Sequence, residues 1–185
     1  MPRPPLVRLA RRVAYRTPWI RVEEHRLGLR ASGREITYSF MAAAPSVSIV
    51  AVTPRKRILL VRQYRYPTQG YNYELPGGGA GRLPLARAAR KELEEETGRR
   101  AGRLRKLGEY VVYSGVSSEI CHVFLATEMR PGRQRLEETE HLTVHEVTYR
   151  QLQRMIARGR FRDGMGLASL HIAGPVLRRM GIAGA

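Results

Sequence analysis

Three glutamates, Glu92, Glu95 and Glu96, have the spacing and chemistry of a metal site. They fall in the segment 84–97, whose apolar residues recur at helical intervals, so the spacing i, i+3, i+4 places all three carboxylates on one face of a helix. Like charges on adjacent turns repel each other. The cluster therefore indicates a hard cation such as Mg²⁺ or Mn²⁺, which prefers oxygen ligands. A solvated acidic face paired with nearby arginines is the alternative interpretation.

A glycine-rich loop leads directly into this predicted helix. Pro76 and the glycines at 77–79 predict a segment without regular structure. Beyond it, Leu85, Ala89 and Leu93 form an apolar stripe on the helix, separate from the acidic one and suited to packing on a sheet. The loop and the glutamates are thus expected to lie next to each other.

Together these segments resemble the signature of the Nudix hydrolase family. The segment 91–98, KELEEETG, has the family's order of a basic residue, a glutamate, an apolar residue and a glutamate pair before a glycine. RILLVRQYRYP at 57–67 and YELPGGG at 73–79 resemble the Nudix branch that includes ADP-ribose pyrophosphatases. The resemblance implies an α/β fold: an α/β/α sandwich with a mixed sheet, preceded by an N-terminal β segment.

The chain departs from that signature at three positions. Leu83 stands where the family has its first glutamate, and Lys91 replaces an arginine, which keeps the charge and loses the bidentate fork. Arg99 follows the final glycine, where an apolar residue is usual. These changes affect the loop and the support of the site, while the three glutamates of the helix remain.

By resemblance, the divalent ions are held by Glu92, Glu95, Glu96 and the carbonyl of Gly77, with Gly78 as the alternative for the carbonyl. The implied cofactor is Mg²⁺ or Mn²⁺. Such an ion bridges a diphosphate, neutralises its charge and lowers the pKa of a bound water.

The resemblance also implies residues for proton transfer and substrate binding. In the acidic segment 136–144, Glu138 is the expected base and Glu140 an additional metal ligand; a solvated acidic turn is the alternative. Arg65 is expected to bind the diphosphate or its adjoining ribose, and Glu119 to lie near the metals. Arg62 is either a second substrate contact or a surface arginine, since strand alternation puts it on the other face from Arg65.

The implied activity is Mg²⁺-dependent hydrolysis of the diphosphate bond in a nucleoside diphosphate linked to another moiety. ADP-ribose or another nucleotide sugar is the first candidate substrate. Branch members commonly dimerise through their N-terminal β segment, so a homodimer is expected. The expected location of the protein is the cytoplasm. The alternative is a basic RNA- or ribosome-associated module with little or no catalysis.

Net charge supports a polyanionic partner. The 33 basic residues outnumber the 16 acidic ones, for a formal charge of +17, and only three of the basic residues are lysines. Such an excess is typical of proteins that bind nucleic acid or phosphorylated metabolites. The basic residues are scattered along the chain, and a GC-rich genome that encodes surface cations as arginine explains the excess equally well. No stretch approaches the ~20 apolar residues of a membrane span, and a single cysteine excludes a disulfide framework.

Three regions are expected along the chain: a basic N-terminal tail or docking helix at 1–16, the N-terminal β segment at 17–43, and the Nudix domain at 44–185. Alternating apolar runs predict strands, and helical periods occur at 84–97, 149–158 and 166–180.

Overall fold

The structure, a computed structural model, describes residues 3–138 and 140–183. The chain divides into two units, which are described separately. The N-terminal unit comprises Met1–Ala44 and Val111–Ile120, and the main unit comprises Pro45–Tyr110 and Cys121–Ala185.

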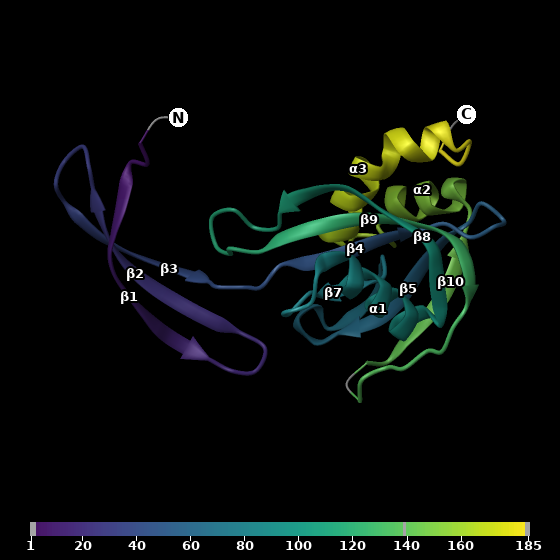
Figure 1. The fold of residues 1–185 in the computed structure, drawn as a ribbon, viewed down its shortest axis with the longest axis horizontal. Helices are drawn as coiled ribbons and strands as arrows, with labels where there is room; N and C mark the ends of the chain where they lie inside the picture. The colour runs from purple at the N-terminus through teal and green to yellow at the C-terminus, as the bar shows by residue number, and fades with distance from the viewer. Residues whose placement is uncertain (1–2, 139, 184–185) are drawn as a thin grey trace. The chain divides into compact units, whose positions relative to one another are not determined.

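The N-terminal unit is built on an antiparallel sheet of three strands, drawn in purple and blue in Figure 1. The strands are β1 (Leu6–Arg16), β2 (Arg21–Leu29) and β3 (Glu35–Met41). Strand β2 is central, because β1 and β3 each pair with it. Trp19, the single tryptophan of the chain, lies in the turn between β1 and β2 and is 78% exposed.

Strand β1 corrects the expectation for residues 1–16. The sequence predicts a basic tail or a helix there, whereas Leu6–Arg16 forms an edge strand of the N-terminal sheet. The physical reason lies in the neighbouring strand: Arg12 is the register partner of Glu24, and its Nε lies 2.7 Å from the Glu24 carboxylate. Opposite charges on directly opposed residues stabilise a sheet. Arg12 thus finds an acidic partner that only the folded chain supplies.

The main unit contains two sheets, ordered β7-β4-β9-β8 and β10-β5-β6. Strand β4 pairs parallel with β9 and antiparallel with β7, so the larger sheet is mixed. The elements are β4 (Ser46–Ala51), β5 (Ile58–Arg65), the 3-10 helix η1 (Tyr66–Thr68), β6 (Gly70–Glu74), β7 (Gly77–Gly79), α1 (Leu85–Thr97), β8 (Arg99–Val111), β9 (Ile120–Pro131), β10 (Leu142–Val147), α2 (Tyr149–Ala157) and α3 (Gly164–Arg179).

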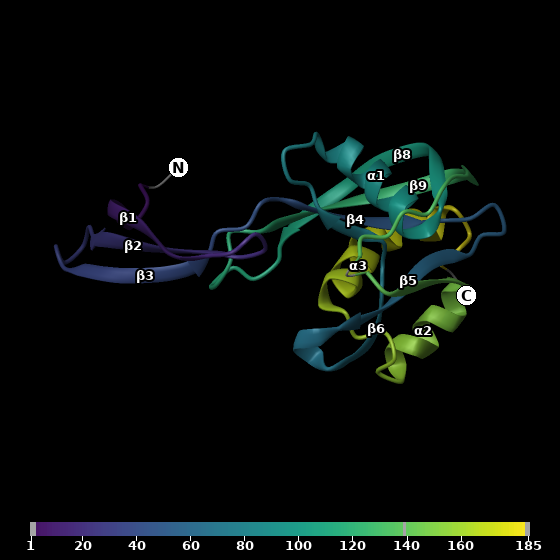
Figure 2. The same cartoon turned by 90° about the horizontal axis from the view of Figure 1, so that it is seen from below.

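Helices cover both faces of the larger sheet. Helix α1 contributes Leu93 to one apolar cluster, which contains Ile49 of β4. Helices α2 and α3 contribute Leu152 and Leu177 to a second cluster, which contains Val50 of the same strand. Figures 1 and 2 show α1 on one side of β4 and α3 on the other. The α/β/α sandwich predicted from the sequence is therefore confirmed.

The glycine segment 77–79 differs from its prediction. It forms the short strand β7, in which Gly77 pairs with Ser48 of β4, and not an irregular loop. The lack of side chains makes this possible: a Cβ on Gly77 would stand 2.2 Å from the carbonyl oxygen of Val47. Elsewhere the three predicted helices are present, and α3 continues through Pro175. Within the described residues, none of the helices combines the length and apolarity that crossing a membrane requires.

Candidate active site

Helix α1 presents the predicted metal ligands, and its packing decides where they point. Ala88, Ala89 and Leu93 are fully buried against the sheet. The carboxylates of Glu92 and Glu96 project beside this apolar stripe, at the edge of the core, where the side chain of Glu92 is 16% exposed and Glu96 as a residue only 4%. The packing of α1 therefore brings acidic groups into a largely dry environment.

Glu96 is held by the glycine strand β7. Its Oε2 accepts a hydrogen bond of 2.9 Å from the backbone N–H of Gly77. The pKa of Glu96 is raised to about 8, chiefly because burial disfavours the charged form and also because the carboxylates of Glu92 and Glu140 lie nearby; the hydrogen bond from Gly77 acts in the opposite direction. A positive charge at this place would favour the ionised carboxylate.

The glycine strand β7 also lies against Glu92. A Cβ on Gly78 would stand 2.8 Å from Oε2 of Glu92, and a Cβ on Gly77 would clash with the backbone of Val47. Side chains at these two positions would displace the strand from the carboxylates. The glycines thus allow backbone atoms to approach the acidic face of α1 directly.

Lys91 is the cation that the helix itself supplies. Its ammonium pairs with the carboxylate of Glu95 and lies 3.7 Å from that of Glu92. Burial raises the pKa of Glu92 above its usual range, while the charge of Lys91 partly offsets that effect. Lys91 therefore neutralises part of the negative charge that Glu92 and Glu95 would otherwise share.

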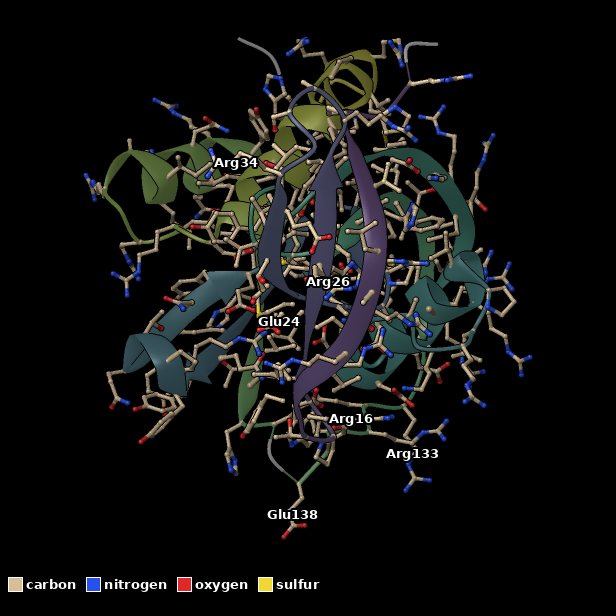
Figure 3. The ribbon with its side chains drawn as sticks, turned by 90° about the vertical axis from the view of Figure 1, so that its left-hand side faces the viewer. Arg16, Glu24, Arg26, Arg34, Arg133 and Glu138 are labelled. Atoms are coloured by element: carbon tan, nitrogen blue, oxygen red, sulfur yellow. The ribbon has the colours of Figure 1, made fainter. Side chains whose placement is uncertain are left out.

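The acidic loop before β10 brings Glu140, and not Glu138, to this cluster. Glu140 accepts a hydrogen bond of 2.9 Å from the backbone N–H of Glu137, and its charge raises the pKa of both Glu92 and Glu96. Glu138 is exposed, and Figure 3 shows its carboxylate directed outward, into solvent. The described arrangement thus separates the two residues that the sequence placed together.

The donors fit a hard divalent cation in type and charge. As they stand, no three carboxylate, imidazole or thiol groups among residues 3–138 and 140–183 converge closely enough to hold a metal ion. In this arrangement Lys91 and the N–H of Gly77 occupy the carboxylates of Glu95 and Glu96. Carboxylate oxygens are nevertheless the type of ligand that Mg²⁺ and Mn²⁺ take.

Arg65, at the end of β5, supplies positive charge on the side of the smaller sheet that faces the glutamates of α1. Its Nη2 and Nε donate hydrogen bonds of 2.6 and 2.9 Å to the carboxylate of Glu74 on β6. The charges of Glu96 and Asp163 also act on this guanidinium. Bidentate pairing of this kind fixes the plane of an arginine.

Arg62 lies on the opposite face of that sheet from Arg65. Its guanidinium carbon is 4.3 Å from the ring centroid of Tyr71 and 5.9 Å from that of Tyr73. The alternation of side chains along β5 predicts this separation. Arg62 therefore does not join Arg65 at the glutamates.

The other predicted positions are placed as follows. Glu119 belongs to the N-terminal unit, where its backbone N–H donates to the Ser117 hydroxyl at 3.1 Å. Leu83 lies in the turn before α1 and is 37% exposed. Because the residue is a leucine, the carboxylate that the family has at this position is absent. Arg99 begins β8, with its Nη2 3.7 Å from a carboxylate oxygen of Glu146.

Two acidic residues near Arg65 escaped the sequence analysis. Glu74 belongs to β6, where Asn72 and Glu74 alternate with tyrosines, a pattern that places both polar residues on one face. Asp163 accepts a hydrogen bond of 2.7 Å from the N–H of Gly166 and caps α3. An aspartate before an apolar helical run is a recognisable cap signal, so both could have been found.

The chain is similar to known proteins in sequence and in fold. The NUDIX domain profile matches residues 42–165. An ADP-ribose pyrophosphatase of Bacillus subtilis (strain 168) is 36% identical over 131 residues, which are 69% of this chain and 68% of that protein. A GDP-mannose pyrophosphatase of Escherichia coli (strain K12) is 32% identical over 126 residues, 60% of this chain and 63% of that protein.

The fold has close relatives among solved structures. A crystal structure of an ADP compounds hydrolase superposes with a TM-score of 0.84 at 21% sequence identity, over 95% of this chain and 96% of that one. At that identity the likeness concerns the fold. The profile match over 42–165 and the 36% identity to the Bacillus subtilis protein show that the chain belongs to the NUDIX family, as a pyrophosphohydrolase of the branch that resembles ADP-ribose pyrophosphatase.

Proposed function

We propose that this protein hydrolyses the diphosphate bond of a nucleoside diphosphate joined to another group, in a reaction that requires Mg²⁺ or Mn²⁺. ADP-ribose is the first candidate substrate, and another nucleotide sugar such as GDP-mannose is the second. The buried carboxylate of Glu96, held by Gly77 beside Glu92 and Glu140, carries the proposal. The two relatives named for hydrolysis of ADP-ribose and GDP-mannose support the choice of substrates.

In this proposal Glu92, Glu95, Glu96 and the carbonyl of Gly77 hold the divalent ion. When bound, the ion neutralises the diphosphate and lowers the pKa of a water molecule. The N–H of Gly77 keeps one oxygen of Glu96 in place and leaves the other available as a ligand. Lys91 contacts one oxygen of Glu92 and one of Glu95, so the second oxygen of each carboxylate would be available to the ion.

A carboxylate outside the helix takes the proton of the attacking water. The sequence assigns this role to Glu138 and the role of a further ligand to Glu140. The position of Glu140 beside Glu92 and Glu96 supports a role for it at the site, whereas the outward direction of Glu138 favours no such role. Arg65, oriented by Glu74, binds the diphosphate.

We also propose that the protein is a homodimer assembled through the N-terminal unit. That unit carries large apolar side chains at the surface, including Leu9, Val13, Tyr15 and Trp19, which are between 47% and 78% exposed. Exposed apolar patches of this kind mark interaction surfaces. Light scattering after size-exclusion chromatography measures the oligomeric state directly.

The experiment that tests the activity is a panel of ADP-ribose, GDP-mannose and other nucleotide sugars, each assayed with Mg²⁺, with Mn²⁺ and with a chelator. We expect metal-dependent release of a nucleoside monophosphate from at least one of them. The net charge of +17 favours one competing function, an RNA-binding module without catalysis. Tight, metal-independent RNA binding at about 150 mM salt, with no hydrolysis across the panel, would establish that function instead.

A further inference from the structure

A pocket rich in arginine and tyrosine lies in the main unit, on the side of β5 and β6 that bears Arg62. Its volume is about 250 Å³, and it is lined by Arg62, Tyr71, Tyr73, Gly159, Arg160 and Arg162. We propose that this pocket, referred to below as the arginine–tyrosine pocket, binds a phosphomonoester dianion, supplied as a small sugar phosphate or as free phosphate. The proposal is independent of the hydrolytic site.

Arg62 lines the pocket. Its side chain is half-buried, and its guanidinium carbon lies over the Tyr71 ring, 4.3 Å from the ring centroid. A guanidinium over an aromatic ring gains a cation–π interaction and keeps N–H groups free to donate. A guanidinium held in this way donates two parallel hydrogen bonds to a phosphate and loses little side-chain entropy in doing so.

The turn between α2 and α3 supplies the other two arginines. Phe161, with 1% exposure, anchors this turn in the core, so that Arg160 and Arg162 on either side of it remain at the surface. The guanidinium carbon of Arg160 lies 5.8 Å from the ring centroid of Tyr73. Arg162 Nε donates a hydrogen bond of 3.3 Å to Oδ1 of Asn72 on the edge strand β6.

The charge of these arginines is unbalanced. In the part of the chain that the structure describes, Arg62, Arg160 and Arg162 form no ion pair with a carboxylate. Arg65, on the other face of the same sheet, is by contrast neutralised by Glu74. Three guanidinium groups around one cavity repel each other. A phosphomonoester, with a charge of about −1.5 to −2 at pH 7, relieves that repulsion and accepts from several N–H groups at once.

The size of the pocket limits its ligand. At about 250 Å³ it is smaller than the ~300–1,000 Å³ cavities that hold drug-sized molecules. A phosphate group with a small sugar is within that size, whereas an extended nucleic acid requires a longer basic groove. The tyrosine rings, with Tyr71 55% exposed, give the organic part of the ligand an apolar surface to contact.

Isothermal titration calorimetry in the presence of a chelator tests the proposal, with inorganic phosphate and ribose 5-phosphate as probes and ribose as the uncharged control. We expect saturable binding of at least one phosphate probe at concentrations below about 10 mM, and no binding of ribose. The Arg62→Gln and Arg160→Gln variants are expected to weaken that binding by about tenfold or more, since each removes charge-assisted hydrogen bonds. Arg62→Lys keeps the charge and loses the stacked fork, so it should also weaken binding.

Two matched variants locate the effect. Arg150→Gln removes an exposed arginine on α2 outside the pocket, and Arg65→Gln removes the arginine that faces the glutamates. Arg150→Gln is expected to bind the probes as the wild type does. Arg65→Gln removes binding of the probes at the hydrolytic site, so the binding that persists in this variant belongs to the arginine–tyrosine pocket. Melting temperatures confirm that each variant is folded. Tighter binding of ribose 5-phosphate than of phosphate supports a sugar-phosphate site, and equal binding supports a site for the phosphate alone. Absence of saturable binding, equal losses in Arg150→Gln or Arg65→Gln, or tight RNA binding that depends on Arg62 would overturn the proposal.

Discussion

The backbone N–H of Gly77 donates a hydrogen bond of 2.9 Å to the carboxylate of Glu96, a residue 19 positions later in the sequence. This bond joins β7 to α1, so the glycine segment and the acidic helix cannot move independently. It also lowers the pKa of Glu96, but only in part, because burial outweighs it and raises the pKa to about 8. Removal of either partner is therefore informative.

Substitution of Glu96 tests its role in catalysis. If it binds the metal, Glu96→Gln is expected to lower turnover by at least ~100-fold, because metal activation contributes several kcal/mol. The melting temperature should hold or rise, since a buried and repelled carboxylate is removed. Glu94→Gln, on the same helix and paired with Arg100, is the control and should keep most of the activity. Wild-type turnover in Glu96→Gln would exclude the metal assignment.

Gly77 and Gly79 form a matched pair for the glycine segment. A Cβ on Gly77 would stand 2.2 Å from a backbone oxygen, whereas a Cβ on Gly79 meets nothing within 4 Å. We expect Gly77→Ala to reduce the free energy of unfolding by about 1–3 kcal/mol and to reduce activity, and Gly79→Ala to be nearly neutral. Chemical denaturation measures both. Equal effects of the two substitutions would show that the close approach of Gly77 is unimportant.

Glu138 and Glu140 differ in position, and their substitutions should differ in effect. We expect Glu140→Gln to lower turnover by about 100-fold and Glu138→Gln to lower it much less, because only Glu140 acts on Glu92 and Glu96. The measurement is turnover under saturating metal, with the pH profile of each variant. A greater loss in Glu138→Gln would restore the role that the sequence assigns to it.

Asp163 should make stability depend on pH. Burial raises its pKa above the ordinary 3.8. A carboxyl group whose pKa is raised in the folded state contributes most below its unfolded pKa, and that contribution is lost as the pH rises through the folded pKa. The stability of the wild type relative to Asp163→Asn should therefore fall as the pH rises from about 4. Asparagine keeps the cap of α3, so a pH-independent difference would contradict this expectation.

Deletion of residues 1–16 tests the N-terminal sheet. The sequence predicts a basic tail or a docking helix here, and loss of a mere tail would be harmless, whereas the structure places Leu6–Arg16 in β1. We expect the deletion to expose the edge of β2 and to change the oligomeric state or cause aggregation. Arg12→Gln, which breaks only the pair with Glu24, is the mild control. A soluble deletion variant with unchanged assembly and activity would show that β1 is dispensable.

The sequence predicts most reliably what depends on local periodicity. The face of α1 that carries Glu92 and Glu96 follows from residue spacing, and so does the separation of Arg62 from Arg65 on β5. The pairing of Arg65 with Glu74 also lies between neighbouring strands, but it requires knowledge of which strands pair.

Features that depend on distant segments were not predictable in this way. Strand β1 pairs along its length with β2, where Arg12 meets Glu24, and β7 forms because bare glycine backbone reaches β4. The direction of Glu138 depends on the path of a loop, which no periodicity specifies. The role of Glu119 stays a prediction.

Trp19 is the chain's single tryptophan, and it lies exposed in the turn between β1 and β2. Tryptophan fluorescence of this protein therefore originates entirely in the N-terminal unit. An emission shift to shorter wavelength on concentration would report burial of that turn by association, without any added label. Fluorescence therefore follows the N-terminal unit, whereas circular dichroism reports the secondary structure of the whole chain.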